Sequence, residues 1–238
     1  MRVDVAPTPA FIPQPFPQGV RAVVIDVVRA MTSVAWALAS GCDGVCPVGN
    51  EENARERARQ SGAILGGERK GLPPEGFDLG NSPSSYDRET VGGRLVVLTT
   101  SNGTAAVESC LESTQVFGAA FANVEATARR LAEEKDGDIL IVCAGSAGEI
   151  AIDDLAVAGS LMGSLALLAA AEPEDGARTA AAVFDHWKND LPGLLKRSLS
   201  GRKVAGVGLE SDLADCVVTD SHPFPIVLDE EGVFRRGD

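Results

Sequence analysis

Short apolar runs alternate with longer segments of helical character along most of the chain. Residues 20–28, 95–99 and 138–142 are rich in Val, Ile and Leu, the pattern of strands buried on both faces of a parallel sheet. Shorter runs of the same kind predict further strands at residues 2–5, 45–48, 63–65, 115–117 and 225–229. The pattern therefore predicts a sheet with a buried centre.

Segments of helical pattern separate these strands. They cover residues 32–40, 51–60, 104–111, 124–134, 155–171, 174–199 with an interruption at Pro192, and 212–216. Asn123 precedes one of them and is predicted to cap it. Repeated strand–helix alternation is typical of α/β proteins, and neither a linker composition nor an internal repeat divides the chain. We therefore expect one domain over residues 1–238, an α/β fold built as a three-layer α/β/α sandwich with a mixed, largely parallel sheet.

Two parts of the chain depart from this alternation. Prolines crowd residues 7–17, which excludes helical structure there. Residues 66–86 show no periodicity, and long irregular segments inside compact domains are usually functional or disordered. The mixture of acidic, basic and aromatic side chains in this second segment favours an ordered loop.

Residues 155–171 are almost free of charge, which raises the question of a membrane span. The run is shorter than the roughly 20 apolar residues that a spanning helix needs, and basic residues do not flank it. We therefore expect a buried helix and no membrane partner. Gly159 and Gly163 would let that helix pack closely against a neighbour.

The net charge of −13 over 238 residues argues against a nucleic-acid partner, because no stripe of Lys and Arg is present to bind a phosphate backbone. An anionic small molecule would be repelled at long range, so local arginines or a divalent cation must reverse the field at its site. Five cysteines without a disulfide framework, and no signal peptide, predict a cytoplasmic protein. His186 and His222 stand alone, which argues against structural zinc and against a catalytic histidine.

The segments at residues 20–33 and 94–107 share one design, a strand followed by a tight polar loop and a helix. The start of a helix presents free N–H groups and a positive dipole, which together hold anions. The second segment supplies hydroxyl, amide and backbone donors from Thr99, Thr100, Asn102, Gly103 and Thr104. Two such loops in an acidic chain predict a site for a negatively charged small molecule.

Carboxylates follow several of the predicted strands, namely Asp26, Glu68, Asp78, Asp153 and Asp154. Mg²⁺ takes oxygen ligands, usually one or two carboxylates together with water and a substrate phosphate. A bound Mg²⁺ would neutralise the substrate and orient a nucleophile. Arg29 and Arg69 would bind phosphate or a second anionic group through paired donors.

Each of these candidates has a structural alternative. Asp153 and Asp154 could cap the helix that follows them, and Asn102 with the next residue could form an ordinary tight turn. Arg29 could pair with Glu68. From the residues alone, an anion-binding α/β protein is favoured over any named enzyme.

Several known hydrolase patterns are missing. A cysteine phosphatase requires Arg six residues after the cysteine, but Glu149 holds that place after Cys143. Cys143 is therefore better explained as a small buried hydrophobe. Asp26 is not followed by a second Asp two residues later, as a haloacid dehalogenase requires. Neither a Walker A loop nor a nucleophile elbow is present.

Four segments carry a more specific signal. They read IDVVRAMTS at 25–33, GGERKG with GFDLGNSP at 66–71 and 76–83, LTTSNGT at 98–104, and CAGSAG with DDLAVAG at 143–148 and 153–159. Together they resemble the 2-phosphosulfolactate phosphatase family of coenzyme M biosynthesis. A weaker match to the same family, GLESDLADC, occupies residues 208–216. The resemblance implies Mg²⁺-dependent hydrolysis of 2-phosphosulfolactate to 3-sulfolactate and phosphate.

The resemblance also selects site residues, which we take together with the loop donors above. The expected catalytic residues are Asp26, Arg29, Glu68 and Asp154. The expected metal ligands are Asp26, Glu68 and Asp154. The expected substrate-binding residues are Arg69, Asn81, Thr100, Asn102, Gly103 and Thr104. Hydrolysis could proceed by direct attack of water or through a phosphorylated Asp26, and both routes stay open.

Two other functions remain alternatives. One is a phosphatase for another small phosphorylated hydroxy acid, and the other is a non-catalytic phosphoanion-binding protein. The set of carboxylates beside the loop donors favours an enzyme, because a sensor gains less from such a set. The expected partner is a small anionic phosphorylated substrate, and a homodimer is compatible with an acidic enzyme of this size.

Overall fold

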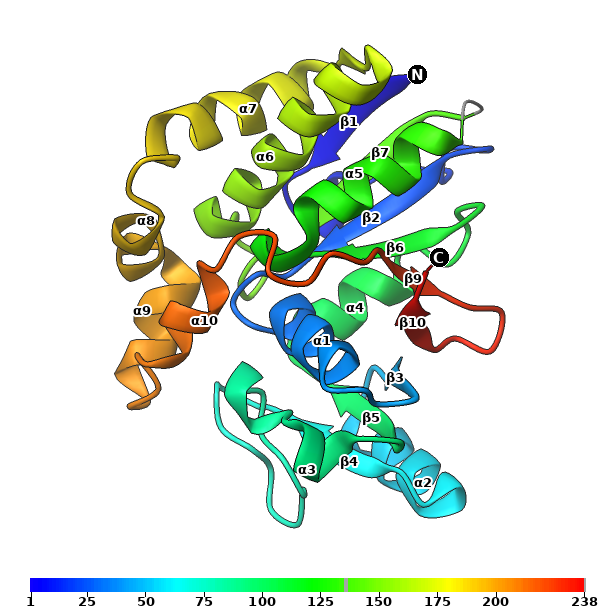
Figure 1. The fold of residues 1–238 in the computed structure, drawn as a ribbon, viewed down its shortest axis with the longest axis vertical. Helices are drawn as coiled ribbons and strands as arrows, with labels where there is room; N and C mark the ends of the chain where they lie inside the picture. Colours follow the sequence, from blue (N-terminus) through cyan, green and yellow to red (C-terminus); the bar gives the residue numbers. More distant parts are fainter. Residues whose placement is uncertain (135–136, 238) are drawn as a thin grey trace.

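One continuous sheet organises the computed structural model, which describes residues 1–134 and 137–237. Within these residues, the sheet has ten strands in the order β4–β5–β3–β10–β9–β6–β2–β7–β1–β8 (Figure 1). The strands are β1 (Arg2–Ala6), β2 (Arg21–Ile25), β3 (Gly44–Pro47), β4 (Ile64–Gly67), β5 (Leu95–Thr99), β6 (Val116–Ala119), β7 (Ile139–Cys143), β8 (Glu172–Pro173), β9 (Ile226–Leu228) and β10 (Phe234–Arg236).

The sheet consists of two parallel halves joined by an antiparallel hairpin. One half is β4–β5–β3, and the other is β6–β2–β7–β1–β8. Between them, β10 pairs antiparallel with β3 and with β9, and β9 pairs antiparallel with β6. The sheet is thus mixed and largely parallel, as the sequence predicts.

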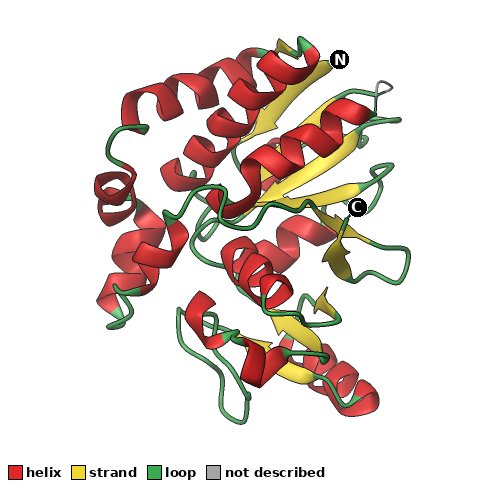
Figure 2. Cartoon of the chain, viewed as in Figure 1, coloured by secondary structure: helices red, strands yellow, loops and turns green. Residues whose placement is uncertain are grey.

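Helices lie around this sheet (Figure 2), and they confirm the three-layer α/β sandwich. They are α1 (Ala30–Ala39), α2 (Glu51–Ser61), α3 (Arg88–Val91), α4 (Gly103–Glu108), α5 (Val124–Glu133), α6 (Ile152–Ala169), α7 (Asp175–Trp187), α8 (Leu191–Arg197), α9 (Leu199–Gly206) and α10 (Asp212–Cys216). Figure 1 shows α5, α6 and α7 side by side over the β6–β2–β7–β1 half. The organisation of residues 1–238 as a single domain stays a prediction.

The buried centre of the sheet explains why its strands were visible in the sequence. All five residues of β2 and of β7 are buried, so each strand reads as an unbroken apolar run apart from Arg21. Two strands were missed. The first, β8, has two residues, and β10 is short and contains Arg235 and Arg236. Charged or minimal strands carry no hydrophobic pattern, so only the pairing partners define them.

Three expectations about the helices need correction. The segment predicted at 174–199 is divided into α7, α8 and the start of α9, and Pro192 lies in the first turn of α8, where proline is tolerated. The proline-rich connector contains a 3₁₀ turn at Pro9–Phe11. Asn123 does hold the predicted N-cap position of α5, but its side chain makes no cap bond to that helix and bonds Gly118, Ala120 and Thr127 instead.

The long apolar helix α6 lies between α5 and α7. It is long and apolar enough to cross a membrane by length and composition, but 56% of that stretch is buried inside the fold, as predicted for a core helix. A Cβ at Gly159 would lie 2.1 Å from the carbonyl oxygen of Ala180, so this glycine allows α7 to approach. Gly163 has no such neighbour, and only half of the predicted glycine pair serves packing.

Candidate active site

A cavity of about 610 Å³ opens where strands of both parallel halves end. The loops after β2, β4, β5 and β7 line it, and α9 forms a further wall. The carboxyl ends of parallel strands are the usual place for ligand sites in α/β sheets. Six of the predicted site residues line this cavity, namely Asp26, Arg29, Glu68, Asn81, Thr100 and Asn102. The other four lie beside it or behind it.

Gly103 allows loops from the two halves of the sheet to approach each other. This residue begins α4, which packs against β2. A Cβ on Gly103 would lie 2.7 Å from Asp26 Oδ2, 2.8 Å from the Ala30 Cβ and 3.2 Å from Thr100 Oγ1. The absence of a side chain therefore lets the loop after β5 reach the carboxylate after β2. Gly103 acts by close approach and does not itself line the cavity.

Asp26 follows the last residue of β2 and is 6% exposed. Its Oδ1 accepts the N–H of Ala30 at 3.2 Å, in the first turn of α1. Burial raises the pKa of Asp26 from 3.8 to about 7, with further contributions from the negative charges of Glu68 and Asp153. A carboxyl group with this pKa can either hold or release a proton near neutral pH.

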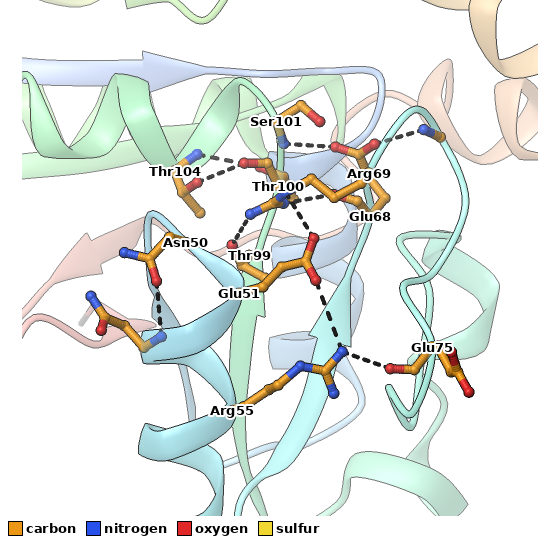
Figure 3. Close-up of polar contacts among 12 residues, drawn as sticks. Asn50, Glu51, Arg55, Glu68, Arg69, Glu75, Thr99, Thr100, Ser101 and Thr104 are labelled. Atoms are coloured by element: carbon orange, nitrogen blue, oxygen red, sulfur yellow. Dashed lines mark hydrogen bonds and ion pairs between the residues drawn. The ribbon is translucent and has the colours of Figure 1, made fainter.

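Glu68 is held by two backbone donors. Its Oε1 accepts the N–H of Ser101 at 2.7 Å, and its Oε2 accepts the N–H of Gly71 at 2.7 Å (Figure 3). The carboxylate thus joins the loop after β4 to the loop after β5. Because each oxygen retains a further lone pair, Glu68 can still accept from or ligate a group in the cavity.

Asp154 has a different environment from the one predicted. Its two oxygens accept the N–H groups of Val27 and Gly145, each at 3.0 Å, so it ties the loop after β2 to the loop after β7. It is buried in the first turn of α6 and does not line the cavity. Burial, then the charges of Asp153 and Asp26, raises the pKa of Asp154 well above its ordinary value. Its catalytic and metal-binding roles stay predictions.

The suggestion that Asp153 and Asp154 cap the helix is wrong, because Ala151 holds the N-cap position. Asp153 is completely buried, and its Oδ1 accepts from Ser200 Oγ at 3.4 Å. Burial raises its pKa to about 6. Burial is thus the main cause of all three raised pKa values, and the charges of neighbouring carboxylates add to it for Asp26 and Asp154.

Arg29 is paired with a residue that the sequence did not identify. Its Nη1 lies 2.5 Å from Asp212 Oδ2 of α10, and both side chains are buried. Its Nη2 donates to the carbonyl oxygen of Gly71 at 2.8 Å. Asp212 also accepts from Ser82 Oγ at 2.7 Å. The suggested pair of Arg29 with Glu68 is therefore replaced by a pair with Asp212, which neutralises the guanidinium.

Arg69 points away from the cavity. It donates to Thr99 Oγ1 at 2.9 Å and to the carbonyl oxygen of Glu68 at 2.7 Å, and its Nε lies 3.4 Å from Glu51 Oε1 (Figure 3). These contacts join α2 to the ends of β4 and β5. Because these contacts engage its guanidinium outside the cavity lining, Arg69 is not placed to contact a substrate as expected.

The remaining predicted donors build and line the loop after β5. Thr104 donates its hydroxyl to the carbonyl oxygen of Thr100 at 2.8 Å and is buried beneath the cavity. Asn102 Oδ1 accepts the N–H of Ala147 at 3.0 Å, which joins this loop to the loop after β7. Asn81 lines the cavity, and its buried Oδ1 has no hydrogen-bond partner among the residues described.

Five polar residues of the cavity lining were not predicted as site residues, namely Lys70, Ser101, Ser146, Ser200 and Lys203. Lys70 lies inside the GGERKG segment and Ser146 inside CAGSAG, so the motifs contained them without assigning them a role. Ser200 and Lys203 belong to α9, and no motif covers that helix. Asp212 lies in the weakly matching segment GLESDLADC, which was the one indication in the sequence that this residue belongs to the site.

The oxygen atoms at this site fit a hard divalent cation. Among residues 1–134 and 137–237, no group of three His, Cys, Asp or Glu side chains is placed to hold a metal. Mg²⁺ commonly needs only one or two carboxylates, however, with water and substrate completing its shell. Asp26 and Glu68 both line the cavity, and the unpartnered Asn81 Oδ1 is a further oxygen that lacks a donor.

Comparison with known proteins identifies the family of this chain. The sequence matches the family model of 2-phosphosulpholactate phosphatase over residues 7–231. A protein of Thermus thermophilus named "Probable 2-phosphosulfolactate phosphatase" is 37% identical over 243 residues, which cover 99% of each chain. Proteins with the same name from Pseudothermotoga lettingae and Thermotoga petrophila are 36% and 37% identical, covering 95% and 84% of this chain and 97% and 85% of theirs. The chain described here belongs to the 2-phosphosulfolactate phosphatase family.

Proposed function

We propose that this protein is a Mg²⁺-dependent phosphatase that hydrolyses 2-phosphosulfolactate to 3-sulfolactate and phosphate. The observation that carries the proposal is the meeting of Asp26 and Glu68 with the Thr100–Asn102 loop in one cavity. Carboxylates alone would repel a phosphate ester. A cation between them and the phosphate resolves that conflict.

Asp26, Glu68 and the Asn81 amide oxygen are the groups that would hold the cation. When bound, Mg²⁺ would withdraw charge from the phosphate oxygens and so make phosphorus a better electrophile. The hydroxyl of Thr100 and the backbone N–H groups of its loop would orient the phosphate. Arg29 lines the same cavity, but its pairing with Asp212 limits it to positioning the loops around the phosphate.

In the reaction, the attacking oxygen forms a bond to phosphorus. The bond between phosphorus and the oxygen of the ester breaks at the same time. The leaving alkoxide must gain a proton, and an attacking water must lose one. Asp26 would accept the proton of the attacking water, since a bound cation would keep its carboxylate ionised, and solvent would protonate the leaving alkoxide. In the alternative route, Asp26 is the nucleophile and water then hydrolyses the phosphoaspartate.

The test is phosphate release from 2-phosphosulfolactate and from a panel of phosphomonoesters, each with Mg²⁺ and with EDTA. We expect Mg²⁺-dependent release, with 2-phosphosulfolactate the best substrate. Release only from other phospho-acids would keep the phosphatase and replace its substrate. Phosphate binding without release from any ester would instead support a non-catalytic binding protein. Acid quenching with ³²P-labelled substrate separates the routes, because only the phosphoaspartate route labels the protein.

A further inference from the structure

Two lysines reach the cavity from different walls, and neither belongs to the set of residues expected to bind the phosphate. Lys203 lies on α9 and donates its Nζ to Ser146 Oγ at 2.8 Å, which directs the ammonium toward the loop after β7. Lys70 lies in the loop after β4, between Glu68 and Gly71. Both residues line the cavity.

The charges in the cavity give these lysines a distinct role. Arg29 is neutralised by Asp212, 2.5 Å away. Neither Lys70 nor Lys203 has a carboxylate within ion-pair distance in the part of the chain that the structure describes. Their positive charge is therefore available to a ligand.

The cavity wall that carries Lys203 also presents apolar side chains, which can contact the carbon chain of a ligand. Ser200, Lys203, Val204 and Val207 follow helical spacing and line the cavity together. A Cβ at Gly71 would lie 3.1 Å from Val207 Cγ2, so the loop that carries Lys70 touches the end of this wall. The result is an apolar surface with a cation on α9 and a second cation on the adjoining loop.

We infer that Lys203, assisted by Lys70, binds a second anionic group of the substrate, a sulfonate or carboxylate on the carbon chain, and thereby selects for phospho-acids over simple phosphate esters. This inference rests on the proposed function. The phosphate belongs with Asp26, Glu68 and the cation that they would hold. The carbon chain then lies along Val204 and Val207, and the second anion meets the ammonium groups.

The chemistry of the substrate class agrees with this division. 2-Phosphosulfolactate carries a carboxylate and a sulfonate in addition to its phosphate, so a second anion remains for the ammonium groups once the phosphate is bound at the cation. Charge-assisted hydrogen bonds are about twice as strong as neutral ones, so they discriminate well between esters with and without the second anion. A substrate that lacked both groups would leave the lysine charges uncompensated in the bound state.

The experiment compares Lys203→Met with Lys196→Met, a change of the same kind on an exposed lysine of α8 outside the cavity. The substrates are 2-phosphosulfolactate, 2-phospholactate without sulfonate, O-phosphoisethionate without carboxylate, and phenyl phosphate without either. We expect Lys203→Met to lower the ratio of kcat/KM for 2-phosphosulfolactate to that for phenyl phosphate by about 30-fold, the size of one lost charged hydrogen bond. Lys196→Met should leave this ratio unchanged, and Lys203→Arg should restore part of it.

The two truncated substrates identify the group that Lys203 binds. If it binds the sulfonate, Lys203→Met will penalise O-phosphoisethionate and spare 2-phospholactate, and the reverse pattern will assign it to the carboxylate. An equal loss of kcat/KM on all four substrates, or no loss on any, would overturn the inference. Thermal melting of each variant checks that the fold is intact.

A separate measurement keeps this inference apart from the proposed function. Calorimetric titration of 3-sulfolactate into the wild type and Lys203→Met requires no turnover. If no ester is hydrolysed but Lys203→Met weakens 3-sulfolactate binding about 30-fold, the proposed activity fails and the anion subsite stands. Equal binding by both proteins, or binding by neither, refutes the subsite whatever the phosphatase assay gives.

Discussion

Replacing Asp212 by Asn would leave the buried guanidinium of Arg29 without a counter-charge. The side chain of Arg29 is 2% exposed and that of Asp212 5%, so water cannot compensate the loss. Removing one partner of such a pair costs about 3–5 kcal/mol, because the remaining charge stays buried. For a chain of 238 residues, this corresponds to a fall in melting temperature of roughly 6–20 °C.

The structure favours the upper part of that range. Asp212 Oδ2 also accepts from Ser82 Oγ at 2.7 Å, and Arg29 also holds the carbonyl oxygen of Gly71 at 2.8 Å. The substitution therefore loosens α10 and two cavity loops together. Because Arg29 lines the cavity, we expect catalytic activity to fall along with stability.

Urea unfolding at constant pH is the assay, and Asp185→Asn is the matched control. Asp185 pairs with Lys188 at 2.9 Å, but both side chains are exposed, and such pairs contribute only about 0–1 kcal/mol. The double variant Arg29→Met/Asp212→Leu should be more stable than Asp212→Asn, since it removes both buried charges. A loss below about 1 kcal/mol in Asp212→Asn would refute the reasoning, because the pair would then behave as an exposed one.

Three further predictions follow from the site. Asp26→Asn should reduce Mg²⁺-dependent phosphate release by at least about 100-fold, the lower end of the range for the loss of an acid–base group. Asp185→Asn should retain the wild-type rate. A wild-type rate in Asp26→Asn would remove this carboxylate from the mechanism. In EDTA, the free energy of unfolding should fall as pH rises from about 4 to 8. The reason is that the folded-state pKa values of Asp26 (about 7) and Asp153 (about 6) exceed their ordinary 3.8, so the folded protein binds more protons in that window and loses this advantage as they ionise. Urea titrations at pH 5 and pH 8 check the sign, and equal values would contradict the shifted pKa values. Gly103→Ala should destabilise the fold by about 1–3 kcal/mol because its Cβ would collide with Asp26 and Ala30. Gly163→Ala, with open space around it in α6, should instead stabilise it by about 0.5–1 kcal/mol, and thermal melts of the two variants should therefore move in opposite directions.

Most of the fold could be predicted from the sequence because buried strands and helices show as apolar runs and as helical spacing of apolar residues. The strand β5 and the helix α10 occupy the residues predicted for them, 95–99 and 212–216. The start of α1 was placed two residues late, since Ala30 and Met31 are equally compatible with a strand end. The hairpin was only half foreseen, because β10 has a charged sequence and owes its place to its neighbours β3 and β9.

The site could be predicted in composition but not in detail. Asp26, Glu68 and Asp154 all follow strands and look equivalent in sequence, yet only the first two line the cavity. What separates them is position, because Asp154 lies in the first turn of α6, where it binds the backbone of the loops after β2 and β7 and does not reach the cavity. The partner of Arg29 lies 183 positions away, so no local pattern could show that its charge is already neutralised.

The hairpin of β9 and β10 has a consequence for how the protein assembles. Glu68 and the loop after β5 belong to one parallel half of the sheet, whereas Asp26 belongs to the other, and these strands are the ones that make the two halves a single sheet. They follow every site residue in the chain, so a ribosome has already released all the site residues before the sheet can close. Contacts that join such distant segments form late, since their loop-closure entropy must be overcome first. During synthesis, the nascent chain therefore carries all the site residues of this enzyme family before it has a continuous sheet to hold the two halves of the cavity in register.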